Sequence, residues 1–422
     1  MGLSKPTNGS ALTPTRADAP RDDNAVPACA DTDPAADGEG FDRHRLTETR
    51  AQKTCGILDA CQRHDFESLA ALAVSESGLV TDQIRRQAWP ILLGCTSDGT
   101  AEEASGPVSA WERLPEHRDE DQTSQGLNGR KAELSELITE VLRRHPYLCY
   151  FQGFHDICQV LLLVLGRQSA VSAVERLSIL RIRDFMLPTL SPALTHLRLL
   201  PSIIQAADVT LYHHLSQTQP FFALPATLTL YAHDIQEYGD IARLFDVLLA
   251  REASFSIYLF AEIVMHRKAE LLEIPPDEPE MLHSVLSKLP KPLDLEHLLS
   301  KAIALVDRHP PESLRPWRQI PRSSVLKTAR DPAVAARQRL SDGAFFYQTL
   351  AVQLRKAEQR QETLNRLWAY RRPAGSIGLA VLIGVLAWWA RKHGGDSPVF
   401  GLQRYLYPMF RRLQSYWWGV GS

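Results

Sequence analysis

The chain has 422 residues, of which 44% are hydrophobic and 23% are charged, a balance typical of a folded protein with two or three domains. Lysine and arginine total 47 against 49 aspartate and glutamate, giving a formal net charge of -2. This composition excludes a wholly disordered or fibrous protein, and without a strongly basic field it argues against nucleic acid as a partner.

Residues 1–44 are predicted to form a disordered arm. They are rich in Ala, Asp, Pro, Thr and Gly and carry almost no large apolar residue after Leu12, so burial could not offset the entropy of ordering them. From residue 45 to residue 310, apolar residues recur at the three- and four-residue spacings of amphipathic helices, and no alternating run is long enough for a sheet. The sequence therefore predicts an all-α domain of many helices over 45–310.

Four segments of this domain are informative. The segment 79–93 predicts a helix with Thr81 or Asp82 at its N-cap and a kink or restart at Pro90. Residues 94–129 are expected to form a loop or a partly ordered segment. An amphipathic helix is predicted over 132–142, and the apolar stretch 154–165 predicts a buried central helix.

The C-terminal part has a different pattern. We expect a linker over 311–332, a basic juxtamembrane helix over 333–372, and a transmembrane helix over 374–390. The last of these carries no charge and is flanked by basic pairs, with two tryptophans at one edge, which is typical of a lipid bilayer interface. The alternative is a buried helix of a soluble domain. The aromatic and basic tail over 391–422 suits a membrane surface.

Standard nucleotide, zinc and serine-hydrolase motifs are missing from the sequence, and no metal site is predicted. One dense polar and aromatic cluster, over 146–156, opens the otherwise apolar central helix. Gln152 on a turn shaped by Tyr150 and Gly153 could both donate to and accept from a water that attacks a phosphate. The alternative is structural: Asp156 capping or pairing in the core, and Gln152 bonded to backbone.

Several motifs together resemble those of TBC domains. They are Arg85-x-x-x-Trp89 followed by Pro90, Tyr150-Phe151-Gln152-Gly153, His155-Asp156-Ile157, Phe222-Ala223-Leu224, His233-Asp234 and Arg243-Leu244-Phe245-Asp246. The resemblance covers roughly residues 79–272, the core of the predicted domain. It implies an all-α, multi-helix fold, with Arg85 and Trp89 either packing the first helices or touching the partner.

TBC domains activate Rab-family small GTPases, so the resemblance implies a Rab partner. With a C-terminal hydrophobic anchor, the chain is most similar to the subfamily anchored in the endoplasmic reticulum that acts in ER-to-Golgi traffic. The implied location is that membrane, with the Golgi as the alternative and the TBC domain facing the cytosol. No cofactor of its own is implied, because GTP and Mg belong to the Rab.

In that family an arginine finger and the glutamine of Y-x-Q-G act in trans, and Gln152 matches the glutamine. The arginine lies in I-x-x-D-x-x-R, which this sequence lacks: after Asp119-Glu120-Asp121-Gln122 it enters the next helix almost at once. Arg130 is the candidate finger, or else a solvated charge at the helix entry, and Arg118 more readily pairs within the domain. The chain is either truly shortened here, or missing an exon, or a Rab-binding protein without catalytic activity.

Overall fold

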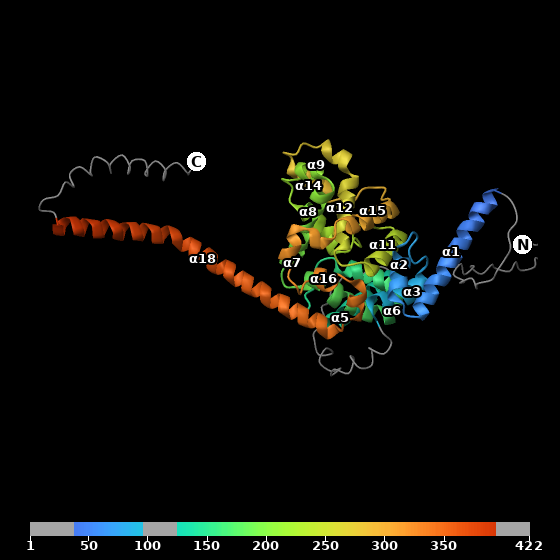
Figure 1. The fold of residues 1–422 in the computed structure, drawn as a ribbon. Helices are drawn as coiled ribbons and strands as arrows, with labels where there is room; N and C mark the ends of the chain where they lie inside the picture. Colours follow the sequence, from blue (N-terminus) through green and yellow to red (C-terminus); the bar gives the residue numbers. More distant parts are fainter. Residues whose placement is uncertain (1–37, 96–124, 394–422) are drawn as a thin grey trace, which may run out of the picture. The chain divides into compact units, whose positions relative to one another are not determined.

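The computed structural model describes residues 38–95 and 125–393, and within them the regular secondary structure is entirely helical (Figure 1). The α-helices are α1 (Gly38–Gln62), α2 (Phe66–Val74), α3 (Asp82–Leu93), α5 (Gln125–Arg144), α6 (Phe154–Arg176), α7 (Ser191–Leu197), α8 (Leu199–Ala207), α9 (Val209–His214), α10 (Leu224–Leu228), α11 (Tyr238–Ala250), α12 (Phe255–His266), α13 (Lys268–Leu272), α14 (Pro279–Leu286), α15 (Leu295–Arg308), α16 (Val325–Thr328), α17 (Pro332–Arg337) and α18 (Leu340–His393). The predicted all-α class is confirmed.

Shorter helical turns join these elements: η3 (Leu177–Arg181), η4 (Arg183–Met186), η5 (Pro220–Ala223), η6 (Pro311–Ser313) and η7 (Arg315–Gln319). Of the predicted arm, residues 1–37 lie outside the described residues, whereas 38–44 are helical and begin α1. The predicted loop over 94–129 lies mostly outside them as well, but α5 starts at Gln125, earlier than the apolar spacing indicated.

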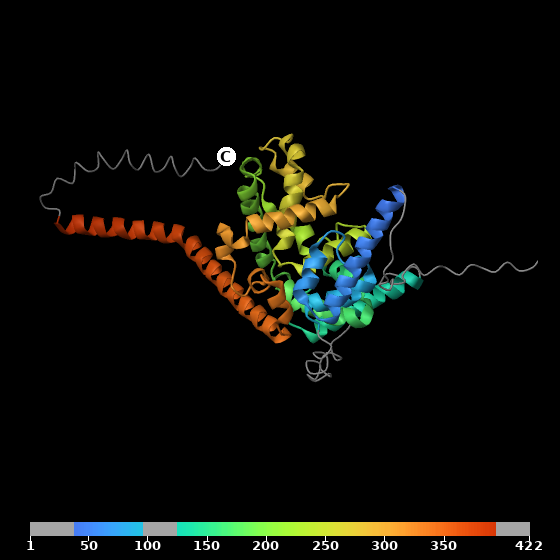
Figure 2. The same ribbon diagram turned by 45° about the vertical axis from the view of Figure 1, so that its right-hand side comes forward.

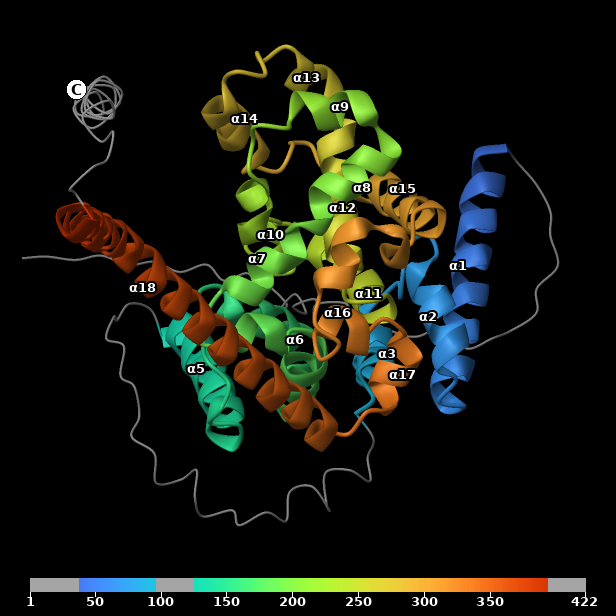
Figure 3. The same ribbon diagram turned by 60° about the vertical axis from the view of Figure 1, so that its left-hand side comes forward.

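The first helices form one packed group. In it, α3 contacts α1, α2 and α11, and the turned view shows α1 to α3, in blue, side by side (Figure 2). Pro90 lies inside α3 and does not end it: three further helical residues follow before Gly94 closes the helix at a φ of 76°. A side chain at Gly94 would overlap the carbonyl of Ala336, which shows how closely α17 approaches α3 (Figure 3).

The long helix α6 is the buried central helix that the sequence predicts. Its first half is apolar on most sides, and the helix breaks at Gly166, whose φ of 71° and ψ of 165° are non-helical. Among the described residues one stretch, Phe154–Arg181, is long and apolar enough to cross a membrane, but half of its most apolar window is buried inside the protein. It is therefore a core element of this domain.

The predicted linker over 311–332 is instead folded onto the domain. Buried apolar side chains, among them Trp317 and Leu326, fix this segment. The buried Asp184 accepts hydrogen bonds from the Ser324 hydroxyl and from the backbone N–H of Val325, at 2.5 and 3.1 Å. The guanidinium of Arg183 is also buried and donates to the carbonyl of Ser323. The apolar residues of this segment stand singly among polar ones, so no helical spacing in the sequence predicted that they would be buried.

The predicted single helix over 333–372 is also wrong, because the chain breaks between α17 and α18. The Arg176 side chain donates to the carbonyls of Ala336 and Gln338, both at 2.8 Å. These hydrogen bonds replace the backbone N–H donors that the two carbonyls would have in a continuous helix. The carboxylate of Asp342 then accepts from the backbone N–H of Arg339 at 3.0 Å, at the start of α18.

The chain divides into two compact units, residues 1–348 and 349–422. The first therefore extends beyond the predicted boundary at residue 310. Within the second, the predicted transmembrane segment 374–390 lies on α18, but the side chains of residues 374–380 and 390 lie outside the described residues, as does the tail from 394 onward. Those described between 381 and 389 include Ile383, Leu386 and Trp388, which are 47, 55 and 61% exposed.

Candidate functional site

The predicted site lies on the connection between α5 and α6. Helix α5 ends at Arg144. Pro146 has no N–H to continue it. The connection is tied to the protein by the backbone N–H of Cys149, which donates to the carbonyl of Met186 at 2.9 Å. This anchor fixes the path of the chain just before the turn that carries the site.

Side chains then point alternately into and out of the protein. Phe151 is buried and packs against Phe154 and Phe185, with ring centroids 5.6 and 6.1 Å apart. Tyr150 and Gln152, on either side of it, are exposed. Because the buried ring fixes the backbone between them, the amide of Gln152 is presented to solvent at the start of α6.

Gly153 makes this turn possible. Its φ is 99°, in the region that favours glycine, and it is the N-cap of α6. A Cβ at this position would lie 2.4 Å from Cγ2 of Thr229, far inside van der Waals contact. The backbone N–H of Phe154 donates to the carbonyl of Phe151 at 3.1 Å and closes the turn around Gln152.

A polar cluster surrounds the turn. The hydroxyl of Tyr150 lies 2.9 Å from Nδ1 of His155, and Oδ1 of Asp156 lies 3.3 Å from Nε2 of the same ring. Oδ2 of Asp156 lies 3.2 Å from Nδ1 of His233, which follows α10. Burial raises the pKa of the neighbouring Asp234; the charge of His233 opposes this rise, whereas that of Asp156 adds to it.

Arg85 and Trp89 belong to a different, buried cluster. The fully buried carboxylate of Asp246 on α11 accepts from Nε and Nη2 of Arg85, both at 3.0 Å, from Nε1 of Trp89 at 2.8 Å, and from the backbone N–H of Leu79 at 3.0 Å. Burial opposes the charge of Arg85, but its hydrogen bonds to Asp246 and Asp82 raise its pKa. Of the two interpretations left open by the sequence, this geometry supports packing of the first helices.

The structure does not bring Arg130 to Gln152. Arg130 is exposed and lies inside α5, not ahead of it. Along the helix axis it is roughly 21 Å from Arg144, at 1.5 Å per residue, and the turn with Gln152 follows that far end. An arginine side chain does not span such a distance, so this position argues against Arg130 as the finger. Arg118 lies outside the described residues.

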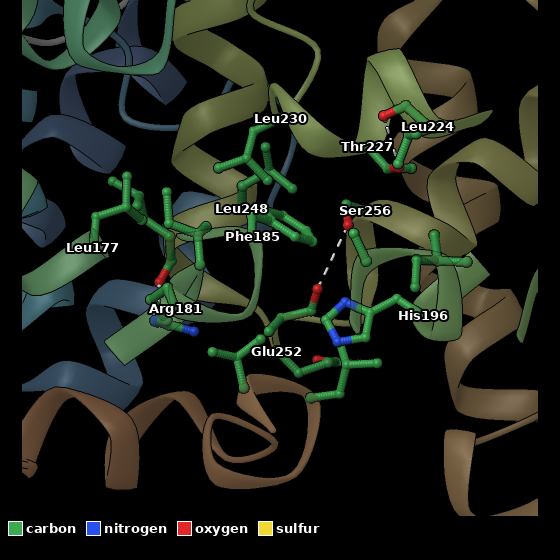
Figure 4. A pocket seen from close by; sticks show the side chains of 17 residues that line it. Leu177, Arg181, Phe185, His196, Leu224, Thr227, Leu230, Leu248, Glu252 and Ser256 are labelled. Atoms are coloured by element: carbon green, nitrogen blue, oxygen red, sulfur yellow. Dashed lines mark hydrogen bonds between the residues drawn. The ribbon is translucent and has the colours of Figure 1, made fainter. Parts of the chain in front are cut away.

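An interior cavity lies among residues of η3, α10 and α12, lined mainly by apolar side chains with Arg181, His196 and Glu252 at its edge (Figure 4). It leaves about 30 Å³ for the centres of water-sized molecules, room for a water but not for a substrate. Where the structure describes the chain, no group of three His, Cys, Asp or Glu side chains is placed to hold a metal ion.

Three residues of the turn and of the buried cluster were not assigned roles from the sequence. Thr229 packs on Gly153, His233 pairs with Asp156, and Asp246 holds Arg85. His233 and Asp246 belong to motifs that resemble those of TBC domains. Their partners, Asp156 and Arg85, lie about 80 and 160 residues earlier, and no pattern in the sequence predicts these pairs. Thr229 carries no motif, so its contact with Gly153 follows only from the fold.

With this geometry in view, the fold and the turn define a class: residues 82–272 match the model of the Rab-GTPase-TBC domain. The chain is 30% identical over 393 residues to TBC1 domain family member 20 of Bos taurus, covering 86% of this chain and 95% of the relative, and equally to that of Homo sapiens. It is also 31% identical over 292 residues to GTPase-activating protein gyp10 of Schizosaccharomyces pombe, covering 65% and 78%. The chain belongs to the TBC-domain family.

Proposed function

We propose that this chain is a GTPase-activating protein for a Rab-family GTPase and that Gln152 orients the water that attacks the γ-phosphate. One observation carries the proposal: an exposed glutamine amide at the start of α6, on a turn that the φ of Gly153 and the buried ring of Phe151 hold in place. Family membership and the similarity to GTPase-activating protein gyp10 support it.

Gln152 forms no covalent bond in this reaction and only has to hold the attacking water in position. Phosphoryl transfer depends on holding the nucleophile in line and on stabilising charge, so a residue that both accepts from a water and donates to it or to the phosphate is effective. GTP and its Mg²⁺ come with the Rab, and the chain supplies no cofactor of its own. Arg85 and Trp89 keep the domain folded through Asp246 and stand outside this chemistry.

The second candidate is a Rab-binding protein that does not accelerate hydrolysis. Two observations favour it: the sequence lacks D-x-x-R after Gln122, and Arg130 lies at the end of α5 remote from Gln152. An arginine finger is worth on the order of 10³ to 10⁵ in rate. A chain without one would bind its Rab and turn over GTP only slightly faster than the Rab alone.

A single-turnover assay of GTP hydrolysis separates the two candidates. The full chain, in detergent, is mixed with a panel of Rabs, and binding is measured in parallel with non-hydrolysable GTP. We expect one Rab to be accelerated and Gln152→Ala to abolish the effect without weakening binding. Gln159→Ala is the matched control, since Gln159 is exposed two turns further along α6. Binding without acceleration would favour the non-catalytic candidate.

We further propose that residues 374–390 of α18 anchor the chain in the membrane of the endoplasmic reticulum, with the Golgi as the alternative, and that its Rab acts in ER-to-Golgi traffic. Support comes from the uncharged run with basic flanks and from the exposed apolar side chains described on α18 between residues 381 and 389. Such a surface is suited to lipid.

Flotation of the full chain with liposomes tests the anchor. Leu382→Asp with Leu386→Asp places two charges within the apolar run, each costing about 2.5 to 3.5 kcal/mol at a bilayer centre, and should abolish flotation. Leu364→Asp is the matched control, because Leu364 is an equally exposed apolar residue of α18 outside 374–390. Flotation that survives the double substitution would count against the anchor.

A further inference from the structure

The turn that carries Gln152 is closed by a side-chain contact as well as by its backbone. The hydroxyl of Tyr150, two residues before Gln152, lies 2.9 Å from Nδ1 of His155, three residues after it. A neutral imidazole has one donor and one acceptor nitrogen, and which is which depends on its partners. The direction of this hydrogen bond therefore depends on what the other ring nitrogen contacts.

Asp156 lies beside that nitrogen. Its Oδ1 is 3.3 Å from Nε2 of His155, at ion-pair distance. The negative charge of the carboxylate favours a proton on Nε2, and Nδ1 of a neutral ring then accepts from the hydroxyl of Tyr150. The carboxylate thus supports the tautomer in which the ring bridges the turn.

The same carboxylate is held from a distant part of the chain. Its Oδ2 lies 3.2 Å from Nδ1 of His233. The segment before His233 is rigidly shaped, since Leu230 and Tyr231 have φ values of 50° and 65°, and the Tyr231 hydroxyl donates to the buried carbonyl of Ser256 at 2.6 Å. Asp156 therefore connects the turn to the segment that follows α10, through the His233 side chain, which is itself 67% exposed.

We infer that Asp156 is a positioning residue for Gln152: acting through His155 on Tyr150, and itself held by His233, it keeps the turn in the geometry that presents the Gln152 amide. This inference rests on the proposed function. Neither Asp156 nor either histidine needs to touch the nucleotide. Because a misplacement of about 1 Å in a positioned group can cost on the order of 10² in rate, loss of this link should slow hydrolysis rather than weaken Rab binding.

The test compares the wild type with four single variants and one double variant in the single-turnover assay and in a separate Rab-binding assay. Asp156→Ala removes the acceptor, and Tyr150→Phe removes the donor. Asp156→Asn keeps an oxygen toward His155 and presents an amide N–H to the other tautomer of His233. Glu237→Ala is the matched control, since it removes an exposed carboxylate four residues beyond His233.

We expect Asp156→Ala and Tyr150→Phe each to slow hydrolysis by about 10- to 100-fold with Rab affinity unchanged. The two together should be no slower than either alone, because they break one connection. Asp156→Asn should retain most of the rate, and Glu237→Ala all of it.

The outcomes separate this inference from the proposed function. If Gln152→Ala loses the acceleration while Asp156→Ala and Tyr150→Phe retain it, the inference alone is overturned. If Asp156→Asn is as slow as Asp156→Ala, the carboxylate is not acting through an acceptor oxygen and the inference is likewise wrong. If the wild type accelerates no Rab, the proposed function fails and the positioning role with it. Should Asp156→Ala not fold, Tyr150→Phe, which removes only a hydroxyl from a side chain 48% exposed, decides the matter.

Discussion

Gly153→Ala is the substitution whose effect follows most directly from the geometry of the turn. At a φ of 99° an L side chain costs about 1 to 3 kcal/mol in backbone strain. The new methyl would also lie 2.4 Å from Cγ2 of Thr229, an overlap that costs about 1 to 3 kcal/mol when neighbours must shift. We therefore expect Gly153→Ala to lower the free energy of unfolding by about 2 to 6 kcal/mol, or to displace the turn and abolish acceleration by Gln152.

A second substitution separates the two contributions. Thr229→Ser removes Cγ2 but keeps the hydroxyl, which donates to the carbonyl of Pro225 at 3.0 Å, and the next atom of residue 229, Cβ, would lie 3.7 Å from the added methyl. Equilibrium unfolding in urea should therefore show Gly153→Ala/Thr229→Ser recovering about 1 to 3 kcal/mol relative to Gly153→Ala. A Gly153→Ala chain as stable and active as the wild type, or no recovery in the double variant, would refute this reasoning.

Three other predictions concern the rest of the domain. Asp246→Ala leaves the buried guanidinium of Arg85 without its main partner and should lower the free energy of unfolding by about 3 to 5 kcal/mol in urea titrations; a loss below 1 kcal/mol would contradict the buried cluster. Arg130→Ala should leave the single-turnover rate within about twofold of wild type, because an effect of 10³ or more is expected only of a finger. A chain ending at residue 310 should lose the cooperative unfolding transition that a chain ending at 348 retains, since Arg183 would lose its partner carbonyl at Ser323; equal transitions would show that this segment is dispensable.

Local patterns were sufficient for much of the fold. A stretch that is apolar on all sides predicted the buried α6, and helical periodicity predicted the amphipathic part of α5, because both features depend on residues a few positions apart. The segment 311–332 was mistaken for a linker because its apolar residues are sparse, and its burial depends on Asp184 and Arg183, more than a hundred residues earlier. Such long-range partners leave no periodic trace in the sequence.

The candidate site shows the same division. The Y-x-Q-G motif placed Tyr150, Gln152 and Gly153 on one turn, and the structure has them there. The sequence could not show that Thr229 excludes any side chain at Gly153, or that His233 reaches Asp156, because the fold alone brings these segments together. It also placed Arg130 ahead of a helix that begins five residues earlier than Arg130 itself.

The central claim, that the Gln152 amide orients water by both accepting and donating, is tested most directly by the single-turnover rate of Gln152→Glu with Rab at saturating concentration. Glutamate keeps the length of the side chain and its acceptor oxygen but, when ionised, has no N–H to donate. We expect a loss of about 10² or more for Gln152→Glu, comparable to that of Gln152→Ala, with Rab binding retained. A Gln152→Glu chain that hydrolyses GTP at the wild-type rate would contradict this claim.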